Sequence, residues 1–233
     1  MSVRWVTGFL DSPDRSSEGF WQAVTSSRLS ARRDGGVFAT LLPADGDAYL
    51  RVQVVGDGPA RAHLDLHTDD VAGLAGRAVA LGAVRVSDAE GLVVLRSPAG
   101  LPFCVVAWAG ERVRPAPVGG SLVDQMCLDV PVGSFEAEAG FWSALTGWSR
   151  RPSGLPEFDF LVRPDGLPLR LLLQRTGGER AGMHLDLACV DVPAEVARHV
   201  GLGASVVRRV PGDWTTLRDP SGREYCVTAR RPG

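Results

Sequence analysis

Two histidines in this chain open the same tetrapeptide, His-Leu-Asp-Leu, which begins at His63 and again at His184. Each histidine is followed two residues later by an aspartate, Asp65 or Asp186. Side chains alternate between the two faces of a β-strand, so each His and Asp share one face while the leucines occupy the other. Imidazole and carboxylate groups at this spacing can contact a polar ligand, chelate a divalent metal, or form a hydrogen bond within a cavity.

His67 extends the polar face in the first copy, where the second copy has Ala188. Residues i and i+4 of a strand are about 13 Å apart, so His63 and His67 cannot share one metal ion by themselves. A three-ligand site built on this strand alone is therefore not expected in either copy. A histidine that is hydrogen-bonded inside a cavity or sheet is the favoured interpretation, with ligand contact and metal ligation as alternatives.

The tetrapeptide is part of a longer internal repeat, offset by 121 residues (184 − 63 = 121). The same offset aligns a Phe-Trp pair at residues 20–21 with another at 141–142, and identical residues recur through the stretch after each tetrapeptide. After one added residue in the second copy, the segment 95–105 aligns with the segment 217–227. This period is too long for a solenoid repeat and indicates a tandem duplication of a whole domain.

Length and composition agree with two soluble globular domains. The chain has 233 residues, 45% of them hydrophobic, and a formal net charge of −2, which gives no basic footprint for nucleic acid or an anionic membrane. It contains no lysine, which excludes Schiff-base chemistry. No signal peptide or membrane span is evident, so the cytoplasm is the expected location. Strand-like surroundings indicate buried free thiols for the four cysteines, Cys104, Cys127, Cys189 and Cys226.

Both copies show the same order of predicted elements. Each begins with a strand (4–11; 123–130) and a helix carrying the Phe-Trp pair (18–27; 136–147), followed by further strands (35–42 and 48–55; 158–164 and 168–175). The tetrapeptide strand, a second helix and closing strands complete each copy, with Ser-Pro-Ala-Gly or Asp-Pro-Ser-Gly at the last turn. Strands and helices in this order predict an α+β fold.

Helix-end signals support the second helix of each copy. Asp70 and Asp191 stand where N-cap residues belong, and Gly82 and Gly203 stand where a left-handed C-terminal residue is required. A single apolar stripe is predicted to face the core of each helix, formed by Val71, Leu74, Ala75, Ala78 and Val79 in the first copy and by Val192, Val196 and Val200 in the second.

These features together resemble the vicinal oxygen chelate superfamily, the group of glyoxalases, bleomycin-resistance proteins and extradiol dioxygenases. The resemblance is carried by the Phe-Trp helix, by His-Leu-Asp-Leu with the following Asp-Val and Leu-Gly-Ala, and by the closing strand ending in Phe-Cys-Val or Tyr-Cys-Val. It covers nearly the whole chain, once per half. It implies that each half holds two βαβββ modules whose mixed sheet curls around a cavity.

Metal-dependent members of this superfamily place their ligands on the first and last strands of each module. The resemblance puts His63 and His184 at one such position in each half. At the last-strand position, where those members have glutamate, it puts Cys104 and Cys226, whose apolar neighbours are typical of a core strand.

The remaining ligand positions carry weaker donors. The opening strand of each half offers Thr7 or Gln125, and the last strand of the first module falls near residues 51–53 or 172–174. A catalytic metal normally needs three or four converging His or carboxylate ligands. No metal cofactor is therefore expected, with a divalent metal as the alternative and His63 and His184 as its fallback ligands.

Three further side chains are candidates for contact with a ligand. Trp148 and Trp214 are not duplicated, and unpaired aromatic residues often line an individual cavity. Glu224 shares a strand face with Cys226 by alternation, and its counterpart in the first half is Pro102. Together with His63, Asp65, His184, Asp186 and Gln125, they complete the set of candidate ligand-binding residues.

The sequence thus predicts two vicinal oxygen chelate domains at 1–112 and 122–233, joined by a linker at 113–121. The favoured function is binding of a small apolar or aromatic metabolite without a catalytic metal. The alternatives are a metal-dependent lyase, isomerase or dioxygenase with a degenerate site, and a partly scaffolding protein. We expect a small-molecule ligand, no nucleic acid or membrane partner, and either a pseudo-twofold monomer or a homodimer.

Overall fold

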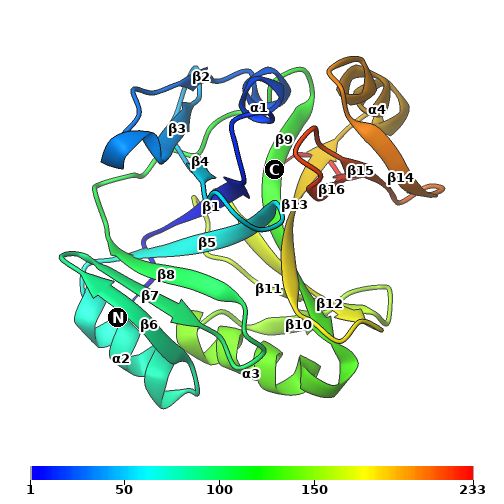
Figure 1. Cartoon of the computed structure of the whole chain (residues 1–233). Helices are drawn as coiled ribbons and strands as arrows, with labels where there is room; N and C mark the ends of the chain where they lie inside the picture. Colours follow the sequence, from blue (N-terminus) through cyan, green and yellow to red (C-terminus); the bar gives the residue numbers. More distant parts are fainter. Residues whose placement is uncertain (1, 233) are drawn as a thin grey trace. The chain divides into compact units, whose positions relative to one another are not determined.

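The computed structural model describes residues 2–232 and has the predicted duplicated α+β architecture (Figure 1). The first half runs through β1 (Trp5–Ser12), α1 (Glu18–Thr25), β2 (Arg28–Leu29), η1 (Asp34–Gly36), β3 (Phe38–Leu42), β4 (Leu50–Val54), β5 (Arg61–Thr68), α2 (Val71–Ala80), β6 (Val84–Ala89), β7 (Leu92–Arg96) and β8 (Pro102–Ala107). This is the order βαβββ, repeated twice, as expected.

The second half repeats the pattern. It runs through β9 (Ser121–Pro131), η2 (Val132–Ser134), α3 (Phe135–Thr146), β10 (Arg150–Pro152), β11 (Phe158–Leu161), β12 (Arg170–Thr176), β13 (Gly182–Cys189), α4 (Val192–Gly201), β14 (Ser205–Val210), β15 (Trp214–Arg218) and β16 (Glu224–Thr228). The tetrapeptides lie on β5 and β13, the first strands of the two second modules.

The strands form two eight-stranded mixed sheets with the same strand order. One sheet has the order β2-β3-β4-β1-β5-β8-β7-β6, and the other has the order β10-β11-β12-β9-β13-β16-β15-β14. Within each second module the first and last strands pair in parallel, β5 with β8 and β13 with β16, and the outer strands pair in antiparallel fashion. The parallel pairing brings the tetrapeptide strand beside the cysteine strand, which positions the site.

The predicted helix-end signals are confirmed. The N–H of Gly73 donates to Asp70 Oδ1 at 2.8 Å, and the N–H of Ala194 donates to Asp191 Oδ1 at 3.0 Å, so both aspartates cap their helices. After each helix the chain turns through a glycine of positive φ, Gly82 at 105° and Gly203 at 108°. Only glycine adopts this conformation without strain.

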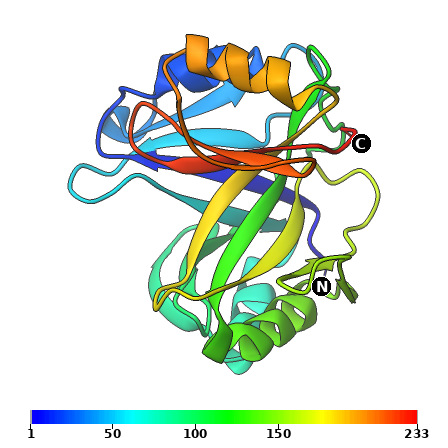
Figure 2. The same ribbon diagram turned by 90° about the vertical axis from the view of Figure 1, so that its right-hand side faces the viewer.

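The apolar stripes of these helices are narrower than predicted. In α2 the buried residues are Leu74, Ala75 and Ala78, whereas Val79 is 46% exposed. In α4 Val196 is buried and Val200 is 46% exposed. Each helix lies on one face of a sheet, as Figure 2 shows for α4 (orange) against β15 and β16 (red). One sheet face covers only part of a helical stripe.

Spatial contacts divide the chain into two compact units, and each unit takes one module from each half. Unit 1 comprises Met1–Thr7, His63–Arg112 and Met126–Met183; unit 2 comprises Gly8–Ala62, Val113–Gln125 and His184–Gly233. The two compact units therefore do not coincide with the two sequence repeats. The sequence boundaries proposed at 112 and 122 stay a prediction.

The core of unit 1 surrounds a buried glutamate. Phe141 and Trp142 of α3 pack against Phe103 of β8, with ring centroids 5.9 and 5.0 Å away. Trp142 Nε1 donates to Glu138 Oε1 at 2.7 Å, and the N–H of Ala99 donates to Glu138 Oε2 at 2.8 Å. Burial raises the pKa of Glu138, although these hydrogen bonds act in the opposite direction.

In the core of unit 2, the equivalent tryptophan and turn N–H groups donate to an aspartate. Trp21 packs against Tyr225 at 5.1 Å, and its Nε1 donates to Asp219 Oδ2 at 2.8 Å. The N–H of Ser221 donates to Asp219 Oδ1 at 2.9 Å. Arg223, 2% exposed, pairs with Asp219 at 2.6 Å. Both tryptophans of the Phe-Trp pairs are fully buried, but their carboxylate acceptors come from different elements.

The segment predicted as a linker is held against a loop of unit 2. The N–H of Val113 donates to Asp47 Oδ2 at 2.8 Å, and the backbone N–H of Asp47 donates to the carbonyl of Val113 at 2.6 Å. Gly46 has a φ of +70°, and a Cβ there would lie 2.7 Å from the backbone nitrogen of Pro115. Only glycine permits this close approach.

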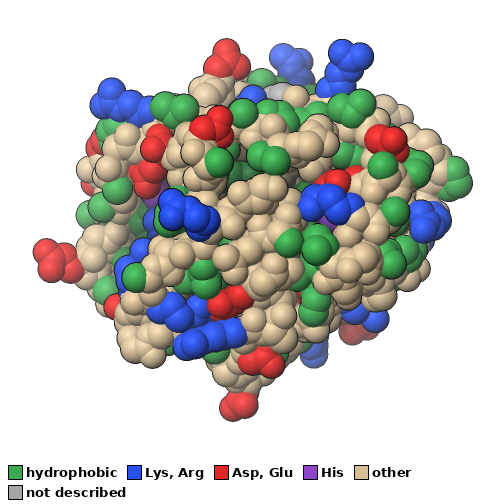
Figure 3. Space-filling view, turned by 90° about the horizontal axis from the view of Figure 1, so that it is seen from above, with side chains coloured by type: hydrophobic (Ala, Val, Ile, Leu, Met, Phe, Trp, Pro, Cys, Tyr) green, Lys and Arg blue, Asp and Glu red, His purple; other side chains and the backbone are tan. Residues whose placement is uncertain are grey.

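The face seen in Figure 3 has no large patch of one charge sign, because arginine and acidic side chains are interspersed with apolar ones. Among residues 2–232, no helix is both long enough and apolar enough to span a bilayer.

Candidate functional site

The second half brings three potential metal donors together in unit 2. His184 Nε2 lies 3.3 Å from Asp186 Oδ1 and 3.7 Å from Cys226 Sγ, and all three donor atoms lie within 4.8 Å of one another. Strand register explains this arrangement, because Asp186 on β13 directly opposes Cys226 on β16. The histidine, two residues earlier on β13, points to the same face.

Two neighbouring side chains hold the acid and the thiol of this cluster. Gln125 on β9 donates a hydrogen bond from Nε2 to Asp186 Oδ2. Thr216 on β15 directly opposes Cys226, and its Oγ1 lies 3.5 Å from Cys226 Sγ. Gln125, a predicted site residue, thus acts on the cluster by fixing the orientation of its carboxylate.

The second-half cluster is largely shielded from water. Asp186 is 3% exposed, and its Oδ1 is buried and accepts no hydrogen bond. The side chain of His184 keeps 15% of its surface accessible. Burial raises the pKa of the Cys226 thiol, and the charge of Asp186 raises it further, against the opposite effect of His184. The arrangement joins a carboxylate, an imidazole and a protonated thiol in a place of low dielectric.

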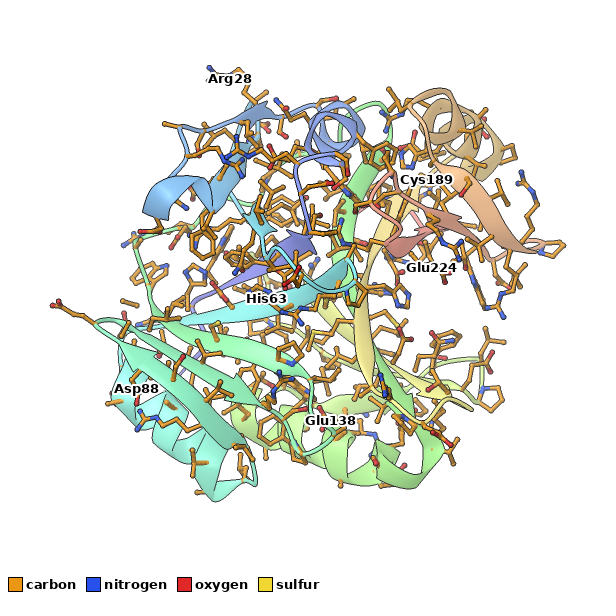
Figure 4. All side chains as sticks on the ribbon, in the orientation of Figure 1. Arg28, His63, Asp88, Glu138, Cys189 and Glu224 are labelled. Atoms are coloured by element: carbon orange, nitrogen blue, oxygen red, sulfur yellow. The ribbon has the colours of Figure 1, made fainter. Side chains whose placement is uncertain are left out.

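The first half repeats the same three residue types in unit 1. His63, Asp65 and Cys104 place one donor atom each within 4.8 Å of the others, and Asp65 on β5 directly opposes Cys104 on β8. His63 Nε2 lies 3.8 Å from Asp65 Oδ1, a wider spacing than in the second half. Figure 4 labels His63 on the β5 strand.

His67, the extra histidine of the first copy, has separate partners. Its Nε2 lies 2.8 Å from Thr7 Oγ1, and its Nδ1 lies 3.6 Å from Glu111 Oε1. Thr7 and His67 are fully buried. As expected from strand geometry, His67 is not part of the cluster around His63.

The other predicted site residues lie apart from the clusters. Trp148 is 4% exposed and packs in unit 1 at the end of α3, where Ser143 Oγ donates to its carbonyl at 2.7 Å. Glu224, labelled in Figure 4, is exposed and pairs with Arg218 at 2.7 Å. Trp214 is half-buried on β15, with the guanidinium carbon of Arg208 5.6 Å from its ring centroid.

The family resemblance puts Cys104 and Cys226 at a ligand position, but their apolar neighbours favour a core strand and exclude them from the predicted site residues. They are buried, as predicted, yet their thiols also lie in the clusters. The duplication contained a usable signal, since both cysteines align in the repeat. The missing information was the parallel register that opposes each cysteine to an aspartate.

Comparison with protein families identifies one model, described as "Glyoxalase-like domain", which matches residues 9–106 and 125–228. No curated protein matches the chain. Among solved structures, a catechol 2,3-dioxygenase is similar at a TM-score of 0.65 and 15% identity, covering 100% of this chain and 90% of that one.

Two further solved structures show the same fold likeness. The Mn(II)-bound glyoxalase from Novosphingobium aromaticivorans has a TM-score of 0.64 at 16% identity, covering 97% of this chain and 81% of its own. A triple mutant of 4-hydroxymandelate synthase from Streptomyces coelicolor has a TM-score of 0.62 at 16% identity, covering 100% and 94%. At these identities the likeness establishes the fold alone.

Proposed function

Because the chain belongs to the glyoxalase-like domain family of the vicinal oxygen chelate superfamily, we propose that it is a divalent-metal-dependent enzyme with its principal site in the second half. The observation that carries this proposal is the convergence of His184 Nε2, Asp186 Oδ1 and Cys226 Sγ. The Mn(II)-bound glyoxalase from Novosphingobium aromaticivorans has the same fold, which supports the choice of a metal-dependent reaction.

The spacing of the donors fits a small tetrahedral ion. For Zn²⁺ with ordinary bond lengths, ligand atoms are separated by about 3.3–3.5 Å for a nitrogen and an oxygen, and by about 3.6 Å for a nitrogen and a sulfur. The corresponding separations from His184 are 3.3 Å to Asp186 and 3.7 Å to Cys226. Asp186 Oδ1, which accepts no hydrogen bond, is the oxygen on this side.

The donor set favours zinc over iron. One imidazole, one carboxylate and one thiol make a nitrogen, oxygen and sulfur set, whereas non-haem Fe(II) oxygenases use two imidazoles and a carboxylate. When bound, such an ion supplies Lewis-acid polarisation of a substrate oxygen. This favours a lyase or isomerase that acts on a small substrate with neighbouring oxygen atoms, with a dioxygenase as the alternative.

The surrounding residues prepare the site. Gln125 orients Asp186 through its amide hydrogen bond, and Thr216 restrains the Cys226 thiol. Partners of this kind fix the geometry of metal ligands and commonly change affinity when removed. Both contacts restrain donor side chains of the second-half cluster.

A second candidate function is binding of a small molecule without a metal. It is favoured by the raised pKa of the buried Cys226 thiol, which leaves that donor protonated and uncharged. Polar groups of the cluster would then form hydrogen bonds with the ligand. The first-half cluster, with its wider His63 to Asp65 spacing, is the better candidate for such a role.

The deciding experiment measures bound metal per chain by elemental analysis after stripping the full-length protein and reloading it with Zn²⁺, Mn²⁺, Ni²⁺ or Fe²⁺. His184→Ala and Cys226→Ser are compared with the matched first-half variants His63→Ala and Cys104→Ser. Loading with Co²⁺ adds a direct readout, because a cobalt–thiolate bond has its own charge-transfer absorption. Folding of each variant is checked by circular dichroism.

We expect one tightly held ion per chain, lost in both second-half variants and kept in both first-half variants. The cobalt–thiolate absorption should disappear in both second-half variants and persist in both first-half variants. A stripped protein that retains none of these metals would overturn the proposal and leave the metal-independent binder. The absence of any ligand-induced thermal stabilisation would then favour a scaffolding role.

A further inference from the structure

A row of four residues crosses the sheet of unit 2 at the level of the second-half cluster. Asp186 on β13 opposes Cys226 on β16, Cys226 opposes Thr216 on β15, and Thr216 opposes Arg208 on β14. Directly opposed residues on neighbouring strands project from the same face of a sheet. Arg208 therefore shares the face that carries the cluster.

Arg208 is held on this face by an aromatic ring. Its guanidinium carbon lies 5.6 Å from the ring centroid of Trp214, which precedes Thr216 by two residues and so projects from the same face. Arg208 is exposed, and it forms no ion pair with a carboxylate in the part of the chain that the structure describes. A restrained, uncompensated guanidinium thus lies at the outer end of the row.

The duplication provides an internal control for this feature. The equivalent row in the first half runs from Asp65 to Cys104, then to Val94 on β7 and Ser87 on β6. Both outer hairpins have a register shift at the same place, between Arg85 and Ser87 in one and between Val206 and Arg208 in the other. The outer hairpin therefore forms without an arginine at the position of Arg208 and without a hydroxyl at the position of Thr216.

The position of Trp214 is also specific to the second half. The first strand residue of β15 is Trp214, whereas the first residue of the equivalent β7 is Leu92. A planar indole beside a guanidinium offers an apolar wall and a cation together. Guanidinium groups recognise carboxylate and phosphate oxygens through paired, charge-assisted hydrogen bonds.

We propose that the second-half site takes a small organic anion, with its carboxylate or phosphate group held by Arg208 and its carbon skeleton against Trp214. Strands in a sheet are about 4.8 Å apart, so the backbone of Arg208 lies about 10 Å from that of Cys226, two strand spacings away. That distance is bridged by a substrate of one ring or a short chain. Its neighbouring oxygen atoms are directed at the cluster, an assignment that rests on the proposed function.

The test is isothermal titration of the full-length protein, both metal-stripped and Zn²⁺-loaded, with three probes that share two adjacent hydroxyl groups. Catechol has no anionic substituent, 3,4-dihydroxybenzoate has a carboxylate, and 3,4-dihydroxyphenylphosphonate has a phosphonate. Arg208→Gln is compared with Arg209→Gln, a matched variant, because Arg209 opposes Thr215 and projects from the other face.

We expect both anionic probes to bind more tightly than catechol, and Arg208→Gln to weaken them about tenfold or more. Catechol binding should change less than about twofold in either variant, as should all binding in Arg209→Gln. Whichever anionic probe binds more tightly identifies a carboxylate or a phosphate as the natural group. Equal affinity for catechol and the anionic probes, or equal losses in both variants, would overturn the inference.

The stripped and loaded arms separate this inference from the proposed function. A preference for the anionic probes that depends on Arg208 in stripped protein supports the anion site even when no metal is taken up. Metal uptake without that preference overturns the anion site and leaves the metal centre standing.

Discussion

The second modules of the two halves, residues 61–107 and 182–228, have the same three donor residues but differ in the residues around them. Each presents a histidine, an aspartate and a cysteine on one face of parallel strands. In the second, Gln125 donates a hydrogen bond to the acid and Thr216 contacts the thiol, whereas the residue opposite the thiol in the first is Val94. Duplicated donors are thus not equivalent sites, because the neighbours decide how well the donors are oriented.

The same two modules also differ at their closing turns. The second has a carboxylate in the turn, Asp219, paired with buried Arg223, whereas the first has Ser97 there and obtains its carboxylate from Glu138 of α3. The tryptophan N–H and the turn N–H are satisfied in both cases. The same two N–H groups are therefore satisfied by a carboxylate of the turn in one case and by a carboxylate of a helix in the other.

The largest effect is expected at the turn of the second module. Asp219→Ala should destabilise the protein by about 3–5 kcal/mol, because it leaves the buried Arg223 guanidinium without its carboxylate. Ser97→Ala, at the same place in the first module, should cost about 1 kcal/mol. Urea unfolding of both variants measures the difference, and equal losses would contradict the asymmetry.

The next effect concerns the two histidines. His184→Ala should weaken Zn²⁺ binding about a hundredfold or more, equivalent to about 2.7 kcal/mol, because a first ligand is lost. His63→Ala should leave the affinity of the second-half site unchanged. Competition with a chromogenic chelator measures both constants, and comparable losses would show that the two clusters are equivalent.

A smaller effect is expected from the residue that orients the acid. Gln125→Ala should weaken Zn²⁺ binding about tenfold, because Asp186 loses its amide hydrogen bond. Glu224→Gln serves as the control, since Glu224 is exposed and pairs with Arg218 on the surface. If Glu224→Gln reduces the affinity as much as Gln125→Ala, the assigned role of Gln125 is wrong.

The smallest effect is a pH dependence of the free energy of unfolding. It comes from Glu138, the carboxylate that accepts the turn N–H of the module at residues 61–107. Burial raises the pKa of Glu138, so its protonated form is favoured in the folded state. Its contribution to stability is complete below the ordinary glutamate pKa and is lost as pH rises through the raised folded pKa.

Glu138→Gln should remove that component of the pH profile. The variant also loses one of two oxygen acceptors, so its stability falls at low pH while its profile becomes flatter. Thermal unfolding across the window measures both. A wild-type stability that rises through this window because of Glu138 would show that its pKa is lowered instead.

Much of the fold follows from local sequence signals. The caps at Asp70 and Asp191, the turns at Gly82 and Gly203, and the alternating tetrapeptide strands were all predictable from residue type and spacing. The two-residue β2 strand was not, because so short and polar a strand exists only through pairing with β3.

The site was predictable in part, for a physical reason. Alternation places His184 and Asp186 on one face, but the third donor comes from a strand about forty residues later, whose parallel register depends on tertiary packing. The position of Arg208 depends on a register shift in the outer hairpin, which moves a side chain relative to its strand without a sequence signature.

The composition of the two units has a consequence for biosynthesis. Unit 2 combines residues 8–62 with residues 184 onward, so the first module leaves the ribosome long before its partner in the same compact body exists. Unit 1 becomes complete earlier, once residue 183 has emerged. Unit 1 can therefore fold before all of unit 2 has been synthesised, and the N-terminal module can complete unit 2 only after residues from 184 onward have emerged.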